Sequence, residues 1–127
     1  MADLEDARRI GLTLPGTSAD DALAVFNGKK MKGFAWVWME RKDPKKARVP
    51  CPDVLAIRTA SLEEKEALLA ADPEKFFTEP HYDGYRAILV RLAKIECDEL
   101  EELLIDAWRC TASRALVNEY DASATRD

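Results

Sequence analysis

ALAVFNGKKMKGFAWVWM, residues 22–39, is the stretch of sequence that decides the fold. Its first five residues, Ala22 to Phe26, are apolar and predict a strand, and Asn27-Gly28 is a strong signal for a hairpin turn. Residues 31–39 are the most apolar part of the chain and predict the returning, antiparallel strand. Alternation along this strand places two groups of side chains on opposite faces, Phe34, Trp36 and Trp38 against Ala35, Val37 and Met39.

The elements after this hairpin follow from capping and turn signals. Residues 40–53 are rich in Lys, Arg and Pro and are predicted as a loop. Ser61-Leu62-Glu63-Glu64 is a capping box that starts a helix at Leu62, and Asp72-Pro73 ends it. The other predicted elements are strands over 54–59, 76–78 and 86–92, a turn over 81–85, and a helix that opens near Asp98 and either continues to Tyr120 or breaks near Thr111.

An amphipathic helix over residues 3–14 precedes the hairpin, and Pro15-Gly16 ends it. The predicted order is α-β-β-β-α-β-β-α, in which short turns join consecutive strands. This order predicts an α+β fold of two layers, with an antiparallel sheet of about five strands and helices on one face. The 127 residues suit one domain over 1–120, and residues 121–127 are expected to be a flexible tail.

Positive charge is concentrated in one part of an acidic chain. The net charge is -5, but residues 29–48 hold eight basic residues against Glu40 and Asp43, which gives +6 there and leaves -11 for the rest. This basic segment is interpreted either as a wing that contacts nucleic-acid phosphates or as a solvated loop. The candidate nucleic-acid-binding residues are Lys29, Lys30, Lys32, Arg41, Lys42, Lys45, Lys46 and Arg48.

The aromatic strand carries two further hypotheses. Phe34, Trp36 and Trp38 form either a stacking platform for single-stranded bases or part of the core under the helices. The opposite face is also apolar, so it is either covered within the chain or forms the surface of a homodimer or another partner complex.

The turn over 80–85 holds the only histidine. His81 is either a general base or a residue with a structural hydrogen bond. Because no nucleophile stands beside it in a recognised motif, an enzyme is not expected. The candidate ligand or turn site is His81, Tyr82, Tyr85, Trp36 and Trp38.

The three cysteines and the N-terminus bear on compartment and cofactors. Cys51, Cys97 and Cys110 share no CxxC spacing, which predicts reduced thiols and neither a disulfide framework nor a metal site. The first six residues are acidic, unlike a signal peptide, and no apolar run is long enough to cross a membrane. We therefore expect a cytoplasmic protein without cofactor, metal or membrane contact.

Several motifs in the second half resemble a known family. They are LAADPEKFF at 69–77, PHYDGY at 80–85, LVRL at 89–92, DEL at 98–100 and DAWR at 106–109. Together with LPGT at 14–17 they resemble the MmcQ/YjbR-like family of small bacterial proteins over roughly residues 5–118. The resemblance implies an α-β(3)-α-β(2)-α fold with a predicted double-wing DNA-binding motif, and it implies no catalytic residue.

Three functions therefore remain open from the sequence. The first is a non-enzymatic module that binds DNA or RNA weakly through the basic segment. The second is a protein-interaction domain that acts as a homodimer through its apolar sheet face. The third is a small-ligand binder or enzyme centred on His81.

Overall fold

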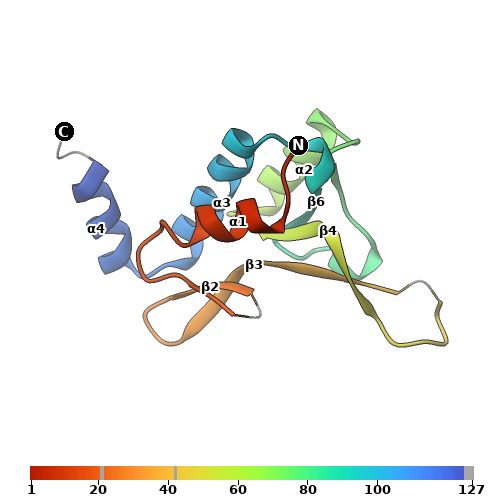
Figure 1. Ribbon diagram of the computed structural model, residues 1–127, viewed down its shortest axis with the longest axis horizontal. Helices are drawn as coiled ribbons and strands as arrows, with labels where there is room; N and C mark the ends of the chain where they lie inside the picture. Colours follow the sequence, from red (N-terminus) through yellow and green to blue (C-terminus); the bar gives the residue numbers. More distant parts are fainter. Residues whose placement is uncertain (21, 42, 125–127) are drawn as a thin grey trace.

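The computed structural model describes residues 1–20, 22–41 and 43–124. Its helices gather on one side of an open sheet, as Figure 1 shows. Two short 3-10 helices, η1 (Pro80–Tyr82) and η2 (Leu92–Lys94), flank the last strand. The other elements are α1 (Leu4–Gly11), β1 (Ser18–Ala19), β2 (Ala22–Phe26), β3 (Met31–Glu40), β4 (Val49–Arg58), α2 (Leu62–Ala71), β5 (Phe76–Phe77), β6 (Ala87–Arg91), α3 (Cys97–Thr111) and α4 (Arg114–Ala124).

The sheet confirms the predicted α+β class. The strands lie in the order β1-β2-β3-β4-β6-β5, and each neighbouring pair is antiparallel. The described strands number six, because the two-residue β1 adds to the five that were predicted. A strand of two residues shows no alternation, so the sequence pattern could not reveal it.

A bulge in β3 overturns the predicted faces of the aromatic strand. Ala24 pairs with Gly33 and Leu23 pairs with Ala35, so Phe34 is an extra residue in the ladder. A bulge lets two successive side chains point toward the same side. Phe34 and Ala35 are therefore both buried in the core under the helices, while Trp36 packs on the opposite face.

The main core lies between the helices and the sheet. Leu100, Leu104 and Trp108 of α3 are fully buried there, together with strand residues such as Ile57 and Val90. The Trp108 indole Nε1 also donates a hydrogen bond to the Pro15 carbonyl at 3.0 Å, which ties α3 to the turn after α1. Burial of this apolar surface is the main force that holds the two layers together.

A second, smaller cluster covers the centre of the reverse sheet face. Ala56 and Leu89 are buried there under Tyr82, which belongs to η1. Trp36 and Trp38 pack at the margin of the same cluster. The connection between β5 and β6 therefore covers the reverse face. The sequence had predicted helices on the other face alone.

The predicted loop over 40–53 is wrong in its second half, because β4 already begins at Val49. Pro50 and Pro52 had argued against a strand, since proline lacks an N–H for the ladder. The structure accommodates them because β4 pairs with β6 only from Val54 onward. Before that residue β4 pairs with β3 on one side, and the β3–β4 hairpin extends away from the body in Figure 1.

Both ends of the chain differ from expectation by a few residues. The first helix ends at Gly11, three residues earlier than predicted. The last predicted helix breaks after Thr111, which was one of the two predicted alternatives. Just after the break, the Ser113 N–H donates to the Phe26 carbonyl at 2.9 Å. Of the predicted tail, residues 121–124 belong to α4, and residues 125–127 lie outside the described residues.

Candidate functional site

The structure divides the basic segment between the two ends of β3. Lys29, Lys30 and Lys32 lie at the β2–β3 end, whereas Arg41, Lys45, Lys46 and Arg48 lie in the β3–β4 hairpin. The ten residues of β3 between them span about 30 Å in extended conformation. The described basic residues are therefore spread over two separate ends of β3 (Figure 1) and do not form one wing.

At the β3–β4 end, both arginines donate to nearby backbone carbonyls, and the two described lysines are exposed. Arg48 donates to the Met39 carbonyl at 2.9 Å and forms an ion pair with Glu79 at 3.9 Å. Arg41 donates to the Pro44 carbonyl at 3.4 Å. Lys45 and Lys46 are exposed, and Lys42 lies outside the described residues. Of the described basic residues at this end, only Arg48 is half-buried.

At the other end, cations from β3, from β4 and from the residue before β6 converge. Lys32 of β3 and Arg58 of β4 line adjoining hollows of about 310 and 120 Å³. Arg86, which directly precedes β6, lines the second hollow together with them. Cys110 at the end of α3 lines both hollows, and burial raises its thiol pKa, which keeps it protonated. Arg58 and Arg86 were missed from the sequence because they are isolated basic residues far from Lys32 along the chain.

Arg58 joins this basic end to a group of aromatic side chains. Its Nε donates to the Gly33 carbonyl at 3.0 Å, and its Nη2 donates to the Tyr85 hydroxyl at 3.2 Å. The guanidinium carbon lies 5.4 Å from the centre of the Trp36 ring and 5.6 Å from that of Tyr85. Both distances are within the range of cation–π attraction. Arg58 is therefore held in one orientation beside the rings.

Four of the five residues of the predicted ligand or turn site line one hollow of about 270 Å³: Trp36, His81, Tyr82 and Tyr85. The Trp36 indole Nε1 donates to the Tyr82 hydroxyl at 3.1 Å, and the ring of Tyr85 stands edge-on to those of Trp36 and Tyr82. The fifth residue, Trp38, lies elsewhere and packs edge-on against Phe77. We call these four residues the aromatic hollow.

A buried lysine holds the segment that forms the aromatic hollow. Lys65 of α2 is only 5% exposed, and its Nζ donates to the Tyr82 carbonyl at 2.6 Å and to the Tyr85 carbonyl at 2.9 Å. Burial lowers the pKa of Lys65, and the charge of Asp83 opposes that shift. Sequence reasoning missed this residue because a lysine in a helix is normally exposed.

The lowered pKa predicts a pH dependence of stability. At pH values below its usual pKa of 10.5, the Lys65 ammonium loses its proton more readily in the folded chain than in the unfolded chain. The unfolded chain then binds more protons, so stability rises with pH in the alkaline range just below 10.5. We expect the free energy of unfolding of the wild type, measured in urea relative to Lys65→Met, to increase as the pH approaches that value. A difference that falls with pH would contradict this assignment.

The side chains that surround His81 in the hollow are aromatic. His81 is exposed and stands edge-on to Tyr82. The other side chains that line the hollow are Trp36, Tyr82 and Tyr85, none of which is a serine, threonine or cysteine nucleophile. The arrangement is suited to binding a flat ring.

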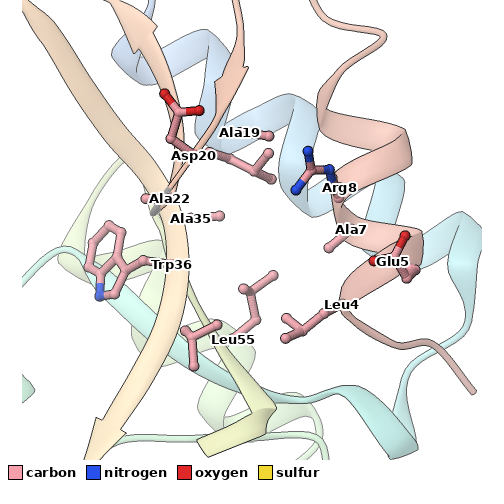
Figure 2. Close-up of a pocket in the computed structure, with 12 residues that line it drawn as sticks. Leu4, Glu5, Ala7, Arg8, Ala19, Asp20, Ala22, Ala35, Trp36 and Leu55 are labelled. Atoms are coloured by element: carbon pink, nitrogen blue, oxygen red, sulfur yellow. The ribbon is translucent and has the colours of Figure 1, made fainter. Parts of the chain in front are cut away.

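A separate apolar groove lies between α1 and β3, as Figure 2 shows. It measures about 210 Å³ and is formed mainly by small or aliphatic side chains, with Glu5, Arg8 and Asp20 at its rim. On the face predicted to be apolar, Ala35 is buried in the core, Val37 lines this groove and Met39 is 43% exposed. The apolar residues lining the groove are Leu4, Ala7, Ala19, Ala22, Leu23, Ala35, Trp36, Val37 and Leu55.

Within residues 1–20, 22–41 and 43–124, no three His, Cys, Asp or Glu side chains are placed so that they could hold a metal ion. In the same part of the chain, no helix is both long and apolar enough to cross a membrane.

Comparison with known proteins places the chain in a family. Residues 12–110 match the family model described as YjbR. Uncharacterized proteins of Mycobacterium bovis and Mycobacterium tuberculosis are 38% identical over 132 residues, which cover 98% of this chain and 99% of each relative. The crystal structure of the Deinococcus radiodurans protein DR2400, with a DUF419 domain, superimposes with a TM-score of 0.61 at 21% identity, over 85% of this chain and 77% of that one.

The structural match concerns the fold, and the sequence matches extend over nearly the whole chain. They confirm the resemblance that the motifs at 69–109 had indicated. The chain therefore belongs to the YjbR family.

Proposed function

We propose that this protein is a non-enzymatic, cytoplasmic binding module for nucleic acid, and that it binds through the cations at the β2–β3 end of the sheet. The observation that carries the proposal is the convergence of Lys32, Arg58 and Arg86 on adjoining hollows beside the half-buried ring of Trp36 and the exposed Tyr85. Arginine and lysine are the residues that bind phosphate most readily, and arginine also stacks on aromatic planes. Lys29 and Lys30 extend the same positive end into the β2–β3 turn.

The charge of the rest of the chain limits the strength of this binding. The net charge is -5, so a polyanion is repelled by most of the surface. With three to five cations in contact, the logarithm of the affinity for a single strand should fall with the logarithm of the salt concentration with a slope of roughly -2 to -4. We therefore expect weak binding that is visible at low salt.

Charge reversal at each end of β3 separates this site from the β3–β4 hairpin. The double variants Lys32→Glu/Arg86→Glu and Lys45→Glu/Lys46→Glu make the same change in net charge. Because the phosphates lie at the first pair, that variant should lose about tenfold in affinity, against about threefold or less for the second. Anisotropy of a labelled oligonucleotide at low salt measures both, and a larger loss in the second variant would assign binding to the hairpin.

As a second candidate, we propose self-association through the groove between α1 and β3. The observation that favours it is the apolar lining of the groove, together with the exposure of Met39, two residues along β3 from Val37. Sedimentation velocity at increasing protein concentration should then show a dimer that Val37→Asp weakens, since this change places a charge in the contact. A monomer at every concentration would exclude the homodimer and leave the nucleic-acid proposal unaffected.

A further inference from the structure

We infer that the aromatic hollow takes one unpaired nucleobase, so that the protein prefers single-stranded nucleic acid to a duplex. This inference rests on the proposed function, because the cations beside the hollow would hold the phosphates of the same strand. Trp36, His81, Tyr82 and Tyr85 line the hollow, and the guanidinium of Arg58 lies against two of these rings.

The size and lining of the hollow suit a single flat ring system. Its volume of about 270 Å³ lies below the roughly 300–1,000 Å³ of pockets for drug-sized ligands. All four lining residues carry rings, and Tyr85 is 42% exposed, so its ring is accessible to an incoming base. Every base has a π-face, so stacking on aromatic side chains binds a single strand with little regard to sequence.

The hollow also offers hydrogen-bonding groups for the edge of a base. The Tyr82 hydroxyl accepts the hydrogen bond of the Trp36 indole, so its own hydrogen remains available to donate. His81 adds an exposed imidazole, which can donate or accept. These groups lie at the hollow itself, whereas Lys32 and Arg86 lie at the neighbouring hollows where phosphates would pass.

The walls of the hollow are already held in place before any ligand binds. Lys65 fixes the carbonyls of Tyr82 and Tyr85, and Arg58 fixes the Tyr85 hydroxyl. Asp83 lies between Tyr82 and Tyr85 in the sequence, is exposed, and its negative charge acts on Lys65. A preorganised site loses little conformational entropy when it binds, which favours affinity from a small contact area.

Duplex nucleic acid cannot use this hollow without disruption. A paired base is stacked in the helix and must be flipped out, at a cost of unstacking and unpairing, before it can enter a pocket. A single strand presents its bases without that cost. The hollow thus favours an unpaired base over a paired one, whereas the cations alone would bind a single strand and a duplex alike.

Fluorescence of 2-aminopurine tests the inference. The probe is a short single-stranded DNA with one 2-aminopurine flanked by thymines, compared with a duplex of equal length at the same low salt concentration. We expect about tenfold tighter binding of the single strand and quenching of the 2-aminopurine on binding. Tyr85→Ala should lose the quenching and about tenfold in affinity, whereas Tyr85→Phe, which keeps the ring, should retain the quenching. Circular dichroism confirms that both variants are folded.

The outcomes separate this inference from the proposed function. Suppose that the single strand and the duplex bind with equal affinity, and that the 2-aminopurine is either not quenched or still quenched by Tyr85→Ala. This result would overturn the single-base site and leave phosphate binding by the cations intact. Absence of binding to either form would overturn the proposed function and the inference with it.

Discussion

Replacing Lys65 with methionine should lower the free energy of unfolding by about 2–3 kcal/mol, because one buried and one partly buried carbonyl lose a charged donor. The ammonium donates to the carbonyls of Tyr82 and Tyr85 at 2.6 and 2.9 Å. A hydrogen bond to a charged group contributes about 1.5–3 kcal/mol, and part of this sum is offset because the variant no longer buries a charge. Urea denaturation followed by tryptophan fluorescence measures the loss.

The matched control is Lys94→Met, in a 3-10 helix where the lysine is exposed. Surface substitutions of this kind change stability by about 0.5 kcal/mol or less. The Lys65 variant should also bind the oligonucleotide more weakly than the Lys94 variant, since Lys65 positions the segment that carries the aromatic hollow. Equal stability of the two variants would show that the ammonium does not support this segment.

Replacing Arg58 with glutamine should weaken oligonucleotide binding by about thirtyfold, the largest loss expected from any single surface change. Arg58 lies between the two parts of the proposed site: it borders Trp36 and Tyr85 and also lines the hollows of Lys32 and Arg86. Glutamine removes the positive charge that would bind a phosphate. It also removes the planar guanidinium that lies against the two rings. Anisotropy at low salt measures the effect.

Two further variants test whether the geometry of Arg58 matters. Arg58→Lys keeps the charge but lacks the planar fork, so its affinity should fall between those of the wild type and Arg58→Gln. Arg91→Gln is the control, because Arg91 also lies over a ring, Phe77 at 4.1 Å, but outside the proposed site. If Arg91→Gln lost as much affinity as Arg58→Gln, the binding would follow net charge and not this site.

Local signals in the sequence were sufficient for most of the elements. The strand from Ala22 to Phe26 and the helix that Ser61 caps were predicted with their bounds nearly unchanged, since their turn and capping residues act within a few positions. The bulge at Phe34 was not predictable, because it arises from the register between two strands. The start of β4 at Val49 was missed because two prolines suit a strand only where one edge is unpaired.

The candidate site was predictable in part for the same reason. The proximity of His81, Tyr82 and Tyr85 in space was expected because they are close in sequence. Trp36 was named because it lies in the predicted aromatic strand. Arg58, Arg86 and Lys65 join them only through the pairing of β4 with β6 and the docking of α2. The charge pattern over 29–48 could not show that β3 would carry its basic residues to two opposite ends.

The most direct test of the proposed site is a proton–nitrogen NMR titration of the protein with a short thymine-rich single strand at low salt. The indole N–H signals of the three tryptophans report on different places: Trp36 in the aromatic hollow, Trp38 beside Phe77, and Trp108 fully buried in the core. We predict large shifts for the Trp36 indole and for the amides of Lys32, Arg58 and Tyr85, with the Trp108 indole unchanged. Shifts confined to Lys45 and Lys46, or no shifts at all, would contradict the assignment of nucleic-acid binding to this end of the sheet.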